Sequence, residues 1–252
     1  MTMSYTPFKF FGKNSRGRDF VVGDIHGSFK ALEQLLQRIN FNPDCDRVFS
    51  VGDLIDRGAE SHRVIEFLNH DWFHSIMGNH ERMLLDSEFN EQVLENWTRY
   101  NGGAWWKQVP EHIRPRIRNV LANLPLAFEV STAVGHIGIV HADIPTGIAW
   151  HQFIRLLDSD PDMEEYALWS RNRYKHFKML GRTVPVEGID LVVFGHTPMS
   201  NPLHTANFYY IDTGASLLDD KALGKLTLLQ IHPVMELHQF DVRTQKREII
   251  PA

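Results

Sequence analysis

The stretch Gly52-Asp53-Leu54-Ile55-Asp56-Arg57-Gly58 directly follows an apolar run at residues 47–51 that predicts a buried strand. The carboxylate of Asp53 has two oxygens, so this single side chain can bridge two cations held about 3.5–4 Å apart. Asp56 and Arg57 follow within the same turn, and on their own they could also be a solvated charge pair in front of a helix. The stretch therefore predicts a strand that ends in a polar loop with ligand-bearing side chains.

The same pattern of a strand followed by a polar motif occurs on both sides of this stretch. Residues 20–22 lead into Gly23-Asp24-Ile25-His26-Gly27, and residues 73–77 lead into Gly78-Asn79-His80-Glu81. Ser28 is a suitable N-cap for a helix after the first motif. Apolar residues at helical spacing follow the first two motifs: Phe29, Leu32, Leu35, Leu36 and Ile39, then Val64, Ile65 and Leu68. Three repeats of strand, motif and helix predict a sheet with crossover helices and a site at the carboxyl ends of its strands.

The rest of the chain predicts one helical segment and a β-rich second half. Residues 81–124 have helical patterning, which suggests a helical insert in the α/β body. Residues 149–187 read as helix and loop. Further strands are expected at residues 126–130, 137–140, 191–194, 208–212, 225–231 and 234–240. Without a repeat or a long linker, the expected organisation is one domain over residues 1–252.

Composition narrows the class of protein. The chain has 252 residues and a formal net charge of -5, which argues against a nucleic-acid partner. Cys45 is the only cysteine, so an intrachain disulfide is impossible, and its turn-like surroundings suggest an incidental thiol. The sequence has no signal-like N-terminus and no apolar run near the roughly 20 residues of a membrane span. A cytoplasmic location and no membrane partner are therefore expected.

Several side chains at predicted strand ends are candidate metal ligands. Asp24 and His26 lie two positions apart, and such residues point the same way in an extended segment, so both could reach one metal. Asn79 offers a neutral carbonyl oxygen, whereas His141 and His196 offer imidazoles, which suit Mn, Fe and Zn. A short Asp-x-His motif occurs in loops by chance, and a single histidine at a strand end is usually only a hydrogen-bonded polar residue. The convergence of all five at strand ends favours metal binding.

Other residues suggest acid catalysis and phosphate binding. His80, next to a candidate ligand, could lie off the metals and give a proton to a leaving oxygen, with Asp56 as its partner. Arg57 is a candidate phosphate clamp because it lies within a motif. A second clamp could be Arg171 or Arg173, which the charge alone does not separate. The other ten of the 14 histidines are expected to be surface or packing residues.

As a set, these motifs resemble the phosphoprotein phosphatase family of dinuclear metallophosphatases. Within that family the sequence is most similar to the bacteriophage-lambda-type and enterobacterial serine/threonine protein phosphatases. The resemblance runs from about residue 21 to residue 231. It includes Gly195-His196-Thr197-Pro198, Asn101-Gly102-Gly103-Ala104-Trp105 and Tyr210-Ile211-Asp212-Thr213-Gly214-Ala215. It implies a mixed α/β, calcineurin-like metallophosphatase fold, in which a two-sheet β-sandwich is flanked by helices and carries a dinuclear metal site at its strand ends.

The resemblance also implies roles for individual residues. The first metal would be held by Asp24, His26 and Asp53. The second would be held by Asp53, Asn79, His141 and His196. His80 would be the general acid paired with Asp56, while Arg57, Arg171 and Asn79 would bind the phosphoryl group. Arg171 is preferred over Arg173 because bacterial members carry Trp-x-Arg at this point.

The expected activity is metal-dependent hydrolysis of phosphoserine and phosphothreonine in proteins, by direct attack of a metal-bound hydroxide. The mixed His, Asp and Asn ligands favour two Mn²⁺ ions, with Fe or Zn as substitutes. The nearest alternative is a dinucleoside polyphosphate hydrolase acting on diadenosine tetraphosphate, and a more distant one is a non-catalytic metal-binding module. The expected partners are phosphoproteins or phosphopeptides, and the chain is expected to be a monomer.

Overall fold

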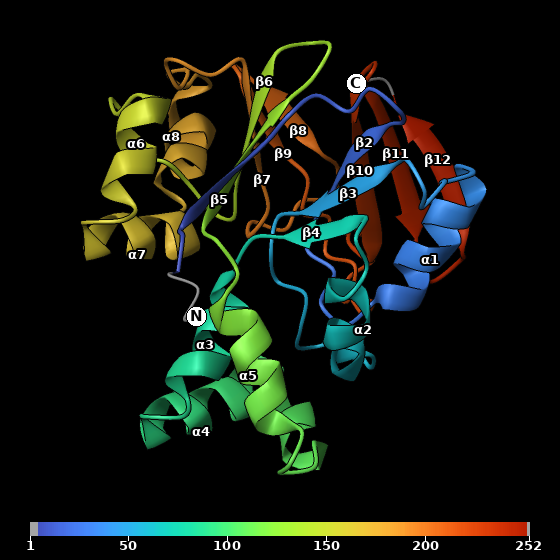
Figure 1. Cartoon of the computed structure of the whole chain (residues 1–252), viewed down its shortest axis with the longest axis vertical. Coiled ribbons are helices and arrows are strands. Elements are labelled where there is room, and N and C mark those ends of the chain that lie inside the picture. The colour runs from blue at the N-terminus through green and yellow to red at the C-terminus, as the bar shows by residue number, and fades with distance from the viewer. Residues whose placement is uncertain (1–4, 251–252) are drawn as a thin grey trace.

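The computed structural model describes residues 5–250 and contains two six-stranded mixed sheets (Figure 1). The first sheet has the strand order β1 (Phe8–Phe11), β5 (Ala127–Ser131), β6 (His136–Val140), β7 (Leu191–Phe194), β9 (Phe208–Tyr210) and β8 (Leu203–Thr205). The second has the order β12 (Lys246–Ile250), β11 (Glu236–Asp241), β10 (Lys225–His232), β2 (Asp19–Val22), β3 (Arg47–Ser50) and β4 (Phe73–Ser75).

The two sheets pack face to face through an apolar layer. Val21 and Phe49 from the second sheet belong to the same buried cluster as Val130 and Ile139 from the first. Because side chains alternate along a strand, the neighbouring residues Phe20 and Val22 point outward and pack with the helices instead. This arrangement confirms the predicted two-sheet sandwich flanked by helices.

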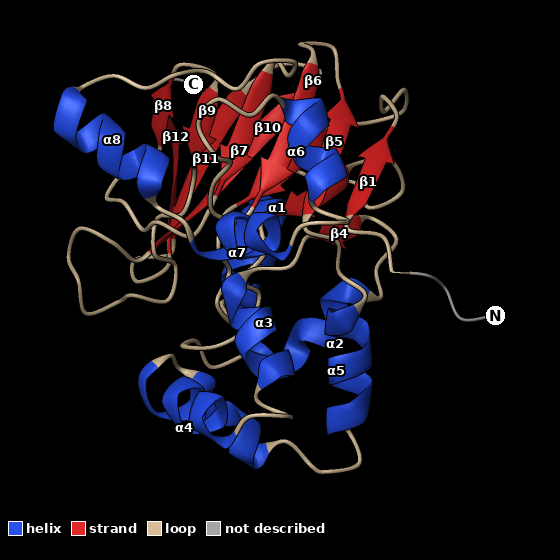
Figure 2. Ribbon diagram, turned by 90° about the vertical axis from the view of Figure 1, so that its left-hand side faces the viewer, coloured by secondary structure: helices blue, strands red, loops and turns tan. Residues whose placement is uncertain are grey.

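Helices cover the outer faces of the sandwich and extend below it (Figure 2). They are α1 (Phe29–Arg38), α2 (Val64–Leu68) after the 3-10 turn η1 (Ser61–Arg63), α3 (Asn79–Asp86), α4 (Glu91–Tyr100), the 3-10 helix η2 (Gly103–Gln108), α5 (Arg114–Ala122), α6 (Trp150–Leu156), α7 (Pro161–Trp169) and α8 (Asn172–Leu180). The run from α3 to α5 lies between β4 and β5 in the sequence and below the sheets in Figure 2, where α2 lies beside α5. None of the helices in residues 5–250 is long and apolar enough to cross a bilayer.

The predicted repeat of strand, motif and helix is confirmed for the first part of the chain. Strands β2, β3 and β4 are neighbours and run parallel, with α1 and α2 in the connections between them. Ser28 occupies the N-cap position of α1 as predicted, but its hydroxyl makes no capping hydrogen bond there. Because the three strands are parallel, their carboxyl ends and the motifs that follow them lie at the same end of the second sheet, where the site is located.

Candidate metal centre

The predicted ligands meet where strands of both sheets end. Asp24 follows β2, Asp53 follows β3 and Asn79 begins α3 after β4. From the other sheet, His141 follows β6 and His196 follows β7, and these two strands are parallel. At most 5% of any of these side chains, or of His26, is exposed.

Hydrogen bonds fasten the loops of the two sheets to each other at this point. The ring Nδ1 of His141 lies 2.8 Å from the carbonyl oxygen of Val51. The backbone N–H of His196 donates to the carboxylate of Asp24, with a nitrogen–oxygen distance of 3.1 Å to Oδ2. A ligand bound here is therefore held by both halves of the sandwich.

The backbone of these loops is left-handed at an unusual number of residues that are not glycine. The φ angles are +44° at His26, +51° at Asp53, +75° at Asp56, +64° at Arg57 and +63° at His196. The extended geometry that the sequence suggested for the Asp24–His26 segment is therefore wrong, because the chain turns at His26. Such conformations are unfavourable for residues with a Cβ and concentrate at functional sites.

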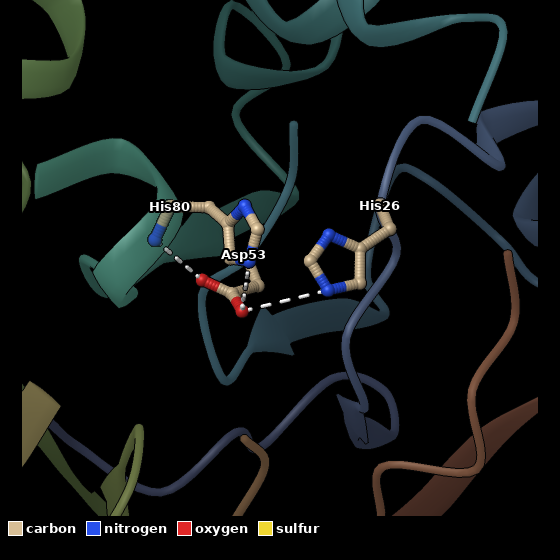
Figure 3. Close-up of side chains that lie close together, drawn as sticks. All are labelled: His26, Asp53 and His80. Carbon is tan, nitrogen blue, oxygen red and sulfur yellow. Dashed lines mark hydrogen bonds and ion pairs between the residues drawn. The ribbon is translucent and has the colours of Figure 1, made fainter. Parts of the chain in front are cut away.

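The first cluster of ligand atoms contains His26, Asp53 and His80 (Figure 3). Asp53 Oδ2 lies 3.5 Å from Nε2 of His26 and 3.9 Å from Nε2 of His80. Nδ1 of His26 lies 2.8 Å from the carbonyl oxygen of Ile55, which can only accept a proton, so Nε2 carries the lone pair. Asp24, expected beside His26, belongs to neither cluster found among the described residues, so its role as a ligand stays a prediction.

The second cluster contains Asp53, His141 and His196. Asp53 Oδ1 lies 3.5 Å from Nε2 of His141. The side-chain oxygen of Asn79 lies 2.8 Å from Nε2 of His141 and 2.9 Å from Nδ1 of His196. Asp53 is therefore shared by the two clusters, with one oxygen facing each, and its role as a bridging ligand stays a prediction.

The protonation of the histidines in this cluster leaves only lone pairs at its centre. Val51 provides a carbonyl oxygen to Nδ1 of His141, and Trp169 provides one to Nε2 of His196 at 3.2 Å, so these nitrogens carry the protons. The other ring nitrogens then face the oxygen of Asn79 with no hydrogen between them. Burial lowers the pKa of both histidines, to about 2 for His196, which keeps the rings neutral. Such a group of acceptors fits a cation.

Several carboxyl groups are buried around the clusters, and burial changes their pKa values. Burial, followed by the charges of Asp212 and Asp53, raises the pKa of Asp24 well above its usual value. Burial raises the pKa of Asp212 to about 6 and, with the charge of Asp53 as a further cause, that of Glu81 to about 7. Burial opposes ionisation of Asp53 as well, but the neighbouring histidines outweigh it and lower its pKa. This excess of buried acid groups favours nearby cations.

Glu81 and Asp212 are site residues that sequence reasoning did not single out. The carboxylate of Glu81 accepts hydrogen bonds from the backbone N–H groups of Asp53 and Leu54 at 2.9 and 2.8 Å and from that of Gly78 at 2.8 Å. It thereby ties the loop after β3 to the loop after β4. Its place at the end of the Gly78–Glu81 motif was the available signal, since a glutamate at the third helical position can bond back to the cap.

His80 and Asp56 form the predicted pair. Nδ1 of His80 lies 2.6 Å from Oδ2 of Asp56, and both residues are buried. Burial alone would lower the pKa of His80, but the carboxylates of Asp53 and Asp56 outweigh it and raise the pKa above its usual value. Arg57 lies against the free face of the pair, with Nη2 3.0 Å from Nε2 of His80 and Nη1 2.6 Å from Nε2 of His26.

The structure separates the two arginines that charge alone did not distinguish. Arg171 is exposed at the edge of the site, and its Nη2 donates to the carbonyl oxygen of His196 at 3.0 Å. Arg173 is buried, with 2% exposed, and its Nε lies 3.3 Å from Oδ1 of Asp143. Its other nitrogens donate to the backbone oxygens of Val184 and Ile144, so it is occupied within the fold.

Most of this chain is similar in sequence to known proteins. A family model described as calcineurin-like phosphoesterase matches residues 20–200. The chain is 38% identical over 199 residues to serine/threonine-protein phosphatase 2 of Salmonella typhimurium, which covers 78% of this chain and 87% of that protein. It is 35% identical over 216 residues to serine/threonine-protein phosphatase 1 of the same organism, covering 84% and 91%.

Other similarities are either shorter or limited to the fold. The chain is 40% identical to the symmetrical bis(5'-nucleosyl)-tetraphosphatase of Pseudomonas putida, but only over 79 residues, 30% of this chain and 27% of that protein. A solved protein serine/threonine phosphatase from Saccharomyces cerevisiae superposes with a TM-score of 0.62 at 14% identity, covering 91% of this chain and 78% of that one. The match of the family model over most of the sequence, together with the two long similarities, shows that the chain belongs to the calcineurin-like phosphoesterase family.

Proposed function

We propose that this protein is a serine/threonine protein phosphatase that hydrolyses phosphomonoesters with the help of two divalent cations, Mn²⁺ being the best fit. The observation that carries the proposal is the position of Asp53, whose two carboxylate oxygens face two separate clusters of ligands. Two adjacent cations suit phosphate-ester hydrolysis, because when bound they polarise the phosphoryl oxygens and lower the pKa of a coordinated water.

The residues present fit two such ions. In the second cluster the lone pairs of His141 and His196 face the side-chain oxygen of Asn79, and in the first the lone pair of His26 lies beside Asp53. This set of nitrogen and oxygen donors suits Mn²⁺, Fe or Zn. We assign Asp24, His26 and Asp53 to the first ion. The second would be held by Asp53, Asn79, His141 and His196.

The remaining residues of the site handle the substrate. His80 holds Nδ1 against Asp56, so Nε2 is the atom that delivers a proton to the leaving oxygen. The guanidinium of Arg57 contacts Nε2 of both His26 and His80. An ion bound to His26 would take the place of Arg57 there and leave the guanidinium of Arg57 available to bind the phosphoryl oxygens. Arg171 would approach the same oxygens from the edge of the site, and Asn79 from the second cluster.

A phosphorylated protein is the substrate best supported. The two serine/threonine-protein phosphatases of Salmonella typhimurium match about four fifths of this chain, whereas the tetraphosphatase similarity covers 30% of it. Hydrolysis of diadenosine tetraphosphate is therefore the second candidate. A single domain over residues 1–252, a monomeric state and a cytoplasmic location stay predictions.

The test is a panel of a phosphoserine peptide, diadenosine tetraphosphate and p-nitrophenyl phosphate in excess Mn²⁺. The phosphopeptide is expected to have the higher kcat/KM of the two natural substrate types. The variant His80→Asn should lower kcat on the phosphopeptide by about 10²–10⁴-fold, while His136→Asn, at a half-exposed histidine, should leave it unchanged. Preferential hydrolysis of the nucleotide would contradict the proposed substrate class, and full activity of His80→Asn would contradict the acid role.

A further inference from the structure

The segment between β4 and β5 contributes two tryptophans to the interior of the site. Trp97 comes from α4 and Trp105 from the 3-10 helix η2. Nε1 of Trp97 donates to Oδ2 of Asp56 at 2.5 Å, and Nε1 of Trp105 donates to Oδ1 of the same carboxylate at 2.7 Å. Both indoles therefore bind a residue that lies 41 and 49 positions earlier in the chain.

These two bonds fix the orientation of the Asp56 carboxylate. Asp56 is fully buried, and a buried carboxylate is costly unless its oxygens are hydrogen-bonded. Without the indoles, the carboxylate could rotate about its Cβ–Cγ bond. With one N–H donor on each oxygen it cannot, and Oδ2 stays aimed at Nδ1 of His80, 2.6 Å away. The indoles thus act on the imidazole through the aspartate.

The turn that connects α4 to η2 contacts the loop that carries Asp56 and Arg57. The carbonyl oxygen of Gly102 accepts the backbone N–H of Arg57 at 3.2 Å. A Cβ at Gly102 would lie 2.5 Å from that nitrogen, and one at Gly103 would lie 2.3 Å from the ring of Trp97. Only glycines allow this approach, and Gly102 also has a φ of +87°. The segment therefore holds both Asp56 and Arg57, which have left-handed backbones, from the side away from the sheets.

We propose that Trp97 and Trp105 are positioning residues for proton transfer to the leaving group, because they fix the Asp56–His80 pair. This inference rests on the proposed phosphatase function and gives the helical segment a part in the chemical step. Proton donation matters most when the leaving group is a poor one, such as the alkoxide of serine. It matters little for p-nitrophenolate, which is a stable anion.

The test compares these two substrates in Trp105→Phe, which keeps an aromatic ring and removes the N–H donor. Trp105 is the better site because it is partly exposed, whereas Trp97 is buried in the core. With saturating Mn²⁺, kcat on a phosphoserine peptide should fall roughly tenfold, while kcat on p-nitrophenyl phosphate should change less than about twofold. The expected result is thus a changed ratio of the two rates, which a general loss of packing would not produce.

Trp106→Phe is the matched control. Trp106 lies next to Trp105 in η2 and is 3% exposed, with its ring centroid 5.6 Å from that of Trp105 and 6.1 Å from that of Trp97. Among the described residues, the indole donors to Asp56 are Trp97 and Trp105, so this control should keep the wild-type ratio. Equal losses on both substrates in Trp105→Phe would overturn the inference. A wild-type protein that hydrolyses no phosphopeptide would overturn the proposed function as well.

A second measurement does not depend on activity. In ¹⁵N-labelled protein, Asp56→Ala should move the indole N–H signals of Trp97 and Trp105 upfield, because each loses a charged acceptor. The indole signal of Trp106 should move much less. Unchanged signals for Trp97 and Trp105 would show that neither indole is bound to Asp56, and the inference would fail.

Discussion

Arg171 and Arg173 are two positions apart and illustrate how burial decides the role of a side chain. Arg173→Ala should lower the free energy of unfolding by about 3–5 kcal/mol, because Asp143 would remain buried without its partner. Arg171→Ala should leave stability nearly unchanged and lower kcat/KM on a phosphopeptide, because its exposed guanidinium faces the site. Urea unfolding and kinetics on both variants check this, and a reversed pattern would contradict the assignment.

His74 in β4 gives a prediction about pH at the same scale. Its ring lies 4.7 Å from that of Phe11 and 5.3 Å from that of Phe49. Burial lowers the pKa of His74 to about 4; the other causes are Arg47 and Lys9, which lower it further, and Asp19 and Asp71, which raise it. In the unfolded chain His74 becomes protonated below about pH 6.5, whereas in the folded chain it stays neutral until about pH 4. The contribution of His74 to the free energy of unfolding is therefore fully present above about pH 6.5 and is lost as the pH falls towards 4.

The variant His74→Leu should therefore lose less stability than the wild type between pH 6.5 and pH 4. Urea unfolding across that range measures the difference. His112→Leu, at an exposed histidine, is the control and should follow the wild-type curve. Parallel curves for His74→Leu and the wild type would show that this histidine does not contribute to acid sensitivity.

At the scale of elements, the loop after β3 approaches the loop after β4 so closely that both Gly52 and Gly78 must lack a Cβ. A Cβ at Gly52 would lie 2.6 Å from the backbone nitrogen of Gly78, and Gly52 has a φ of +92°. Gly52→Ala should lower the free energy of unfolding by more than about 2 kcal/mol and weaken Mn²⁺ binding, because the loop carrying Asp53 must move.

Gly147→Ala separates the clash from the backbone strain. Gly147 has a similar φ of +86°, but a Cβ there would meet nothing within 4 Å. This control should cost only about 1–2 kcal/mol and leave metal binding unchanged, since strain is its only effect. Isothermal titration with Mn²⁺ and urea unfolding distinguish the two variants, and equal effects would show that the contact with Gly78 is unimportant.

The elements that the sequence predicted are those with a continuous apolar pattern. Strands β2, β3 and β7 are buried along their whole length or nearly so, and each ends in a recognisable motif. The strands that were not predicted are β1, β8 and β12, which lie at sheet edges. The described side chains of these three strands are half-buried or exposed, so the strands do not form the continuous apolar runs on which the prediction relied.

The part of the site that could be predicted from the sequence is the part formed by residues of the motifs. The ligand types, the bridging position of Asp53 and the pairing of His80 with Asp56 could all be inferred from the motifs and the family resemblance. The contacts of Trp97 and Trp105 with Asp56 could not, because no ligand or charge pattern in the sequence connects these tryptophans to Asp56. The one hint was that a buried tryptophan needs a partner for its N–H.

For the molecule as a whole, the two sheets meet at a centre that combines neutral histidines with an excess of buried carboxylates. Two hydrogen bonds connect the sheets at this centre, one between His141 and the backbone of Val51 and one between the backbone of His196 and Asp24. Cations bound between them would bind only the folded chain. Metal binding should therefore raise the free energy of unfolding, by about 2.7 kcal/mol at a free concentration 100 times the Kd.

The central claim is that two cations share the carboxylate of Asp53. Anomalous diffraction from crystals of active protein saturated with Mn²⁺ tests it directly. We predict two peaks about 3.5–4 Å apart, with Asp53 between them. One peak, or none, in an active preparation would contradict the account.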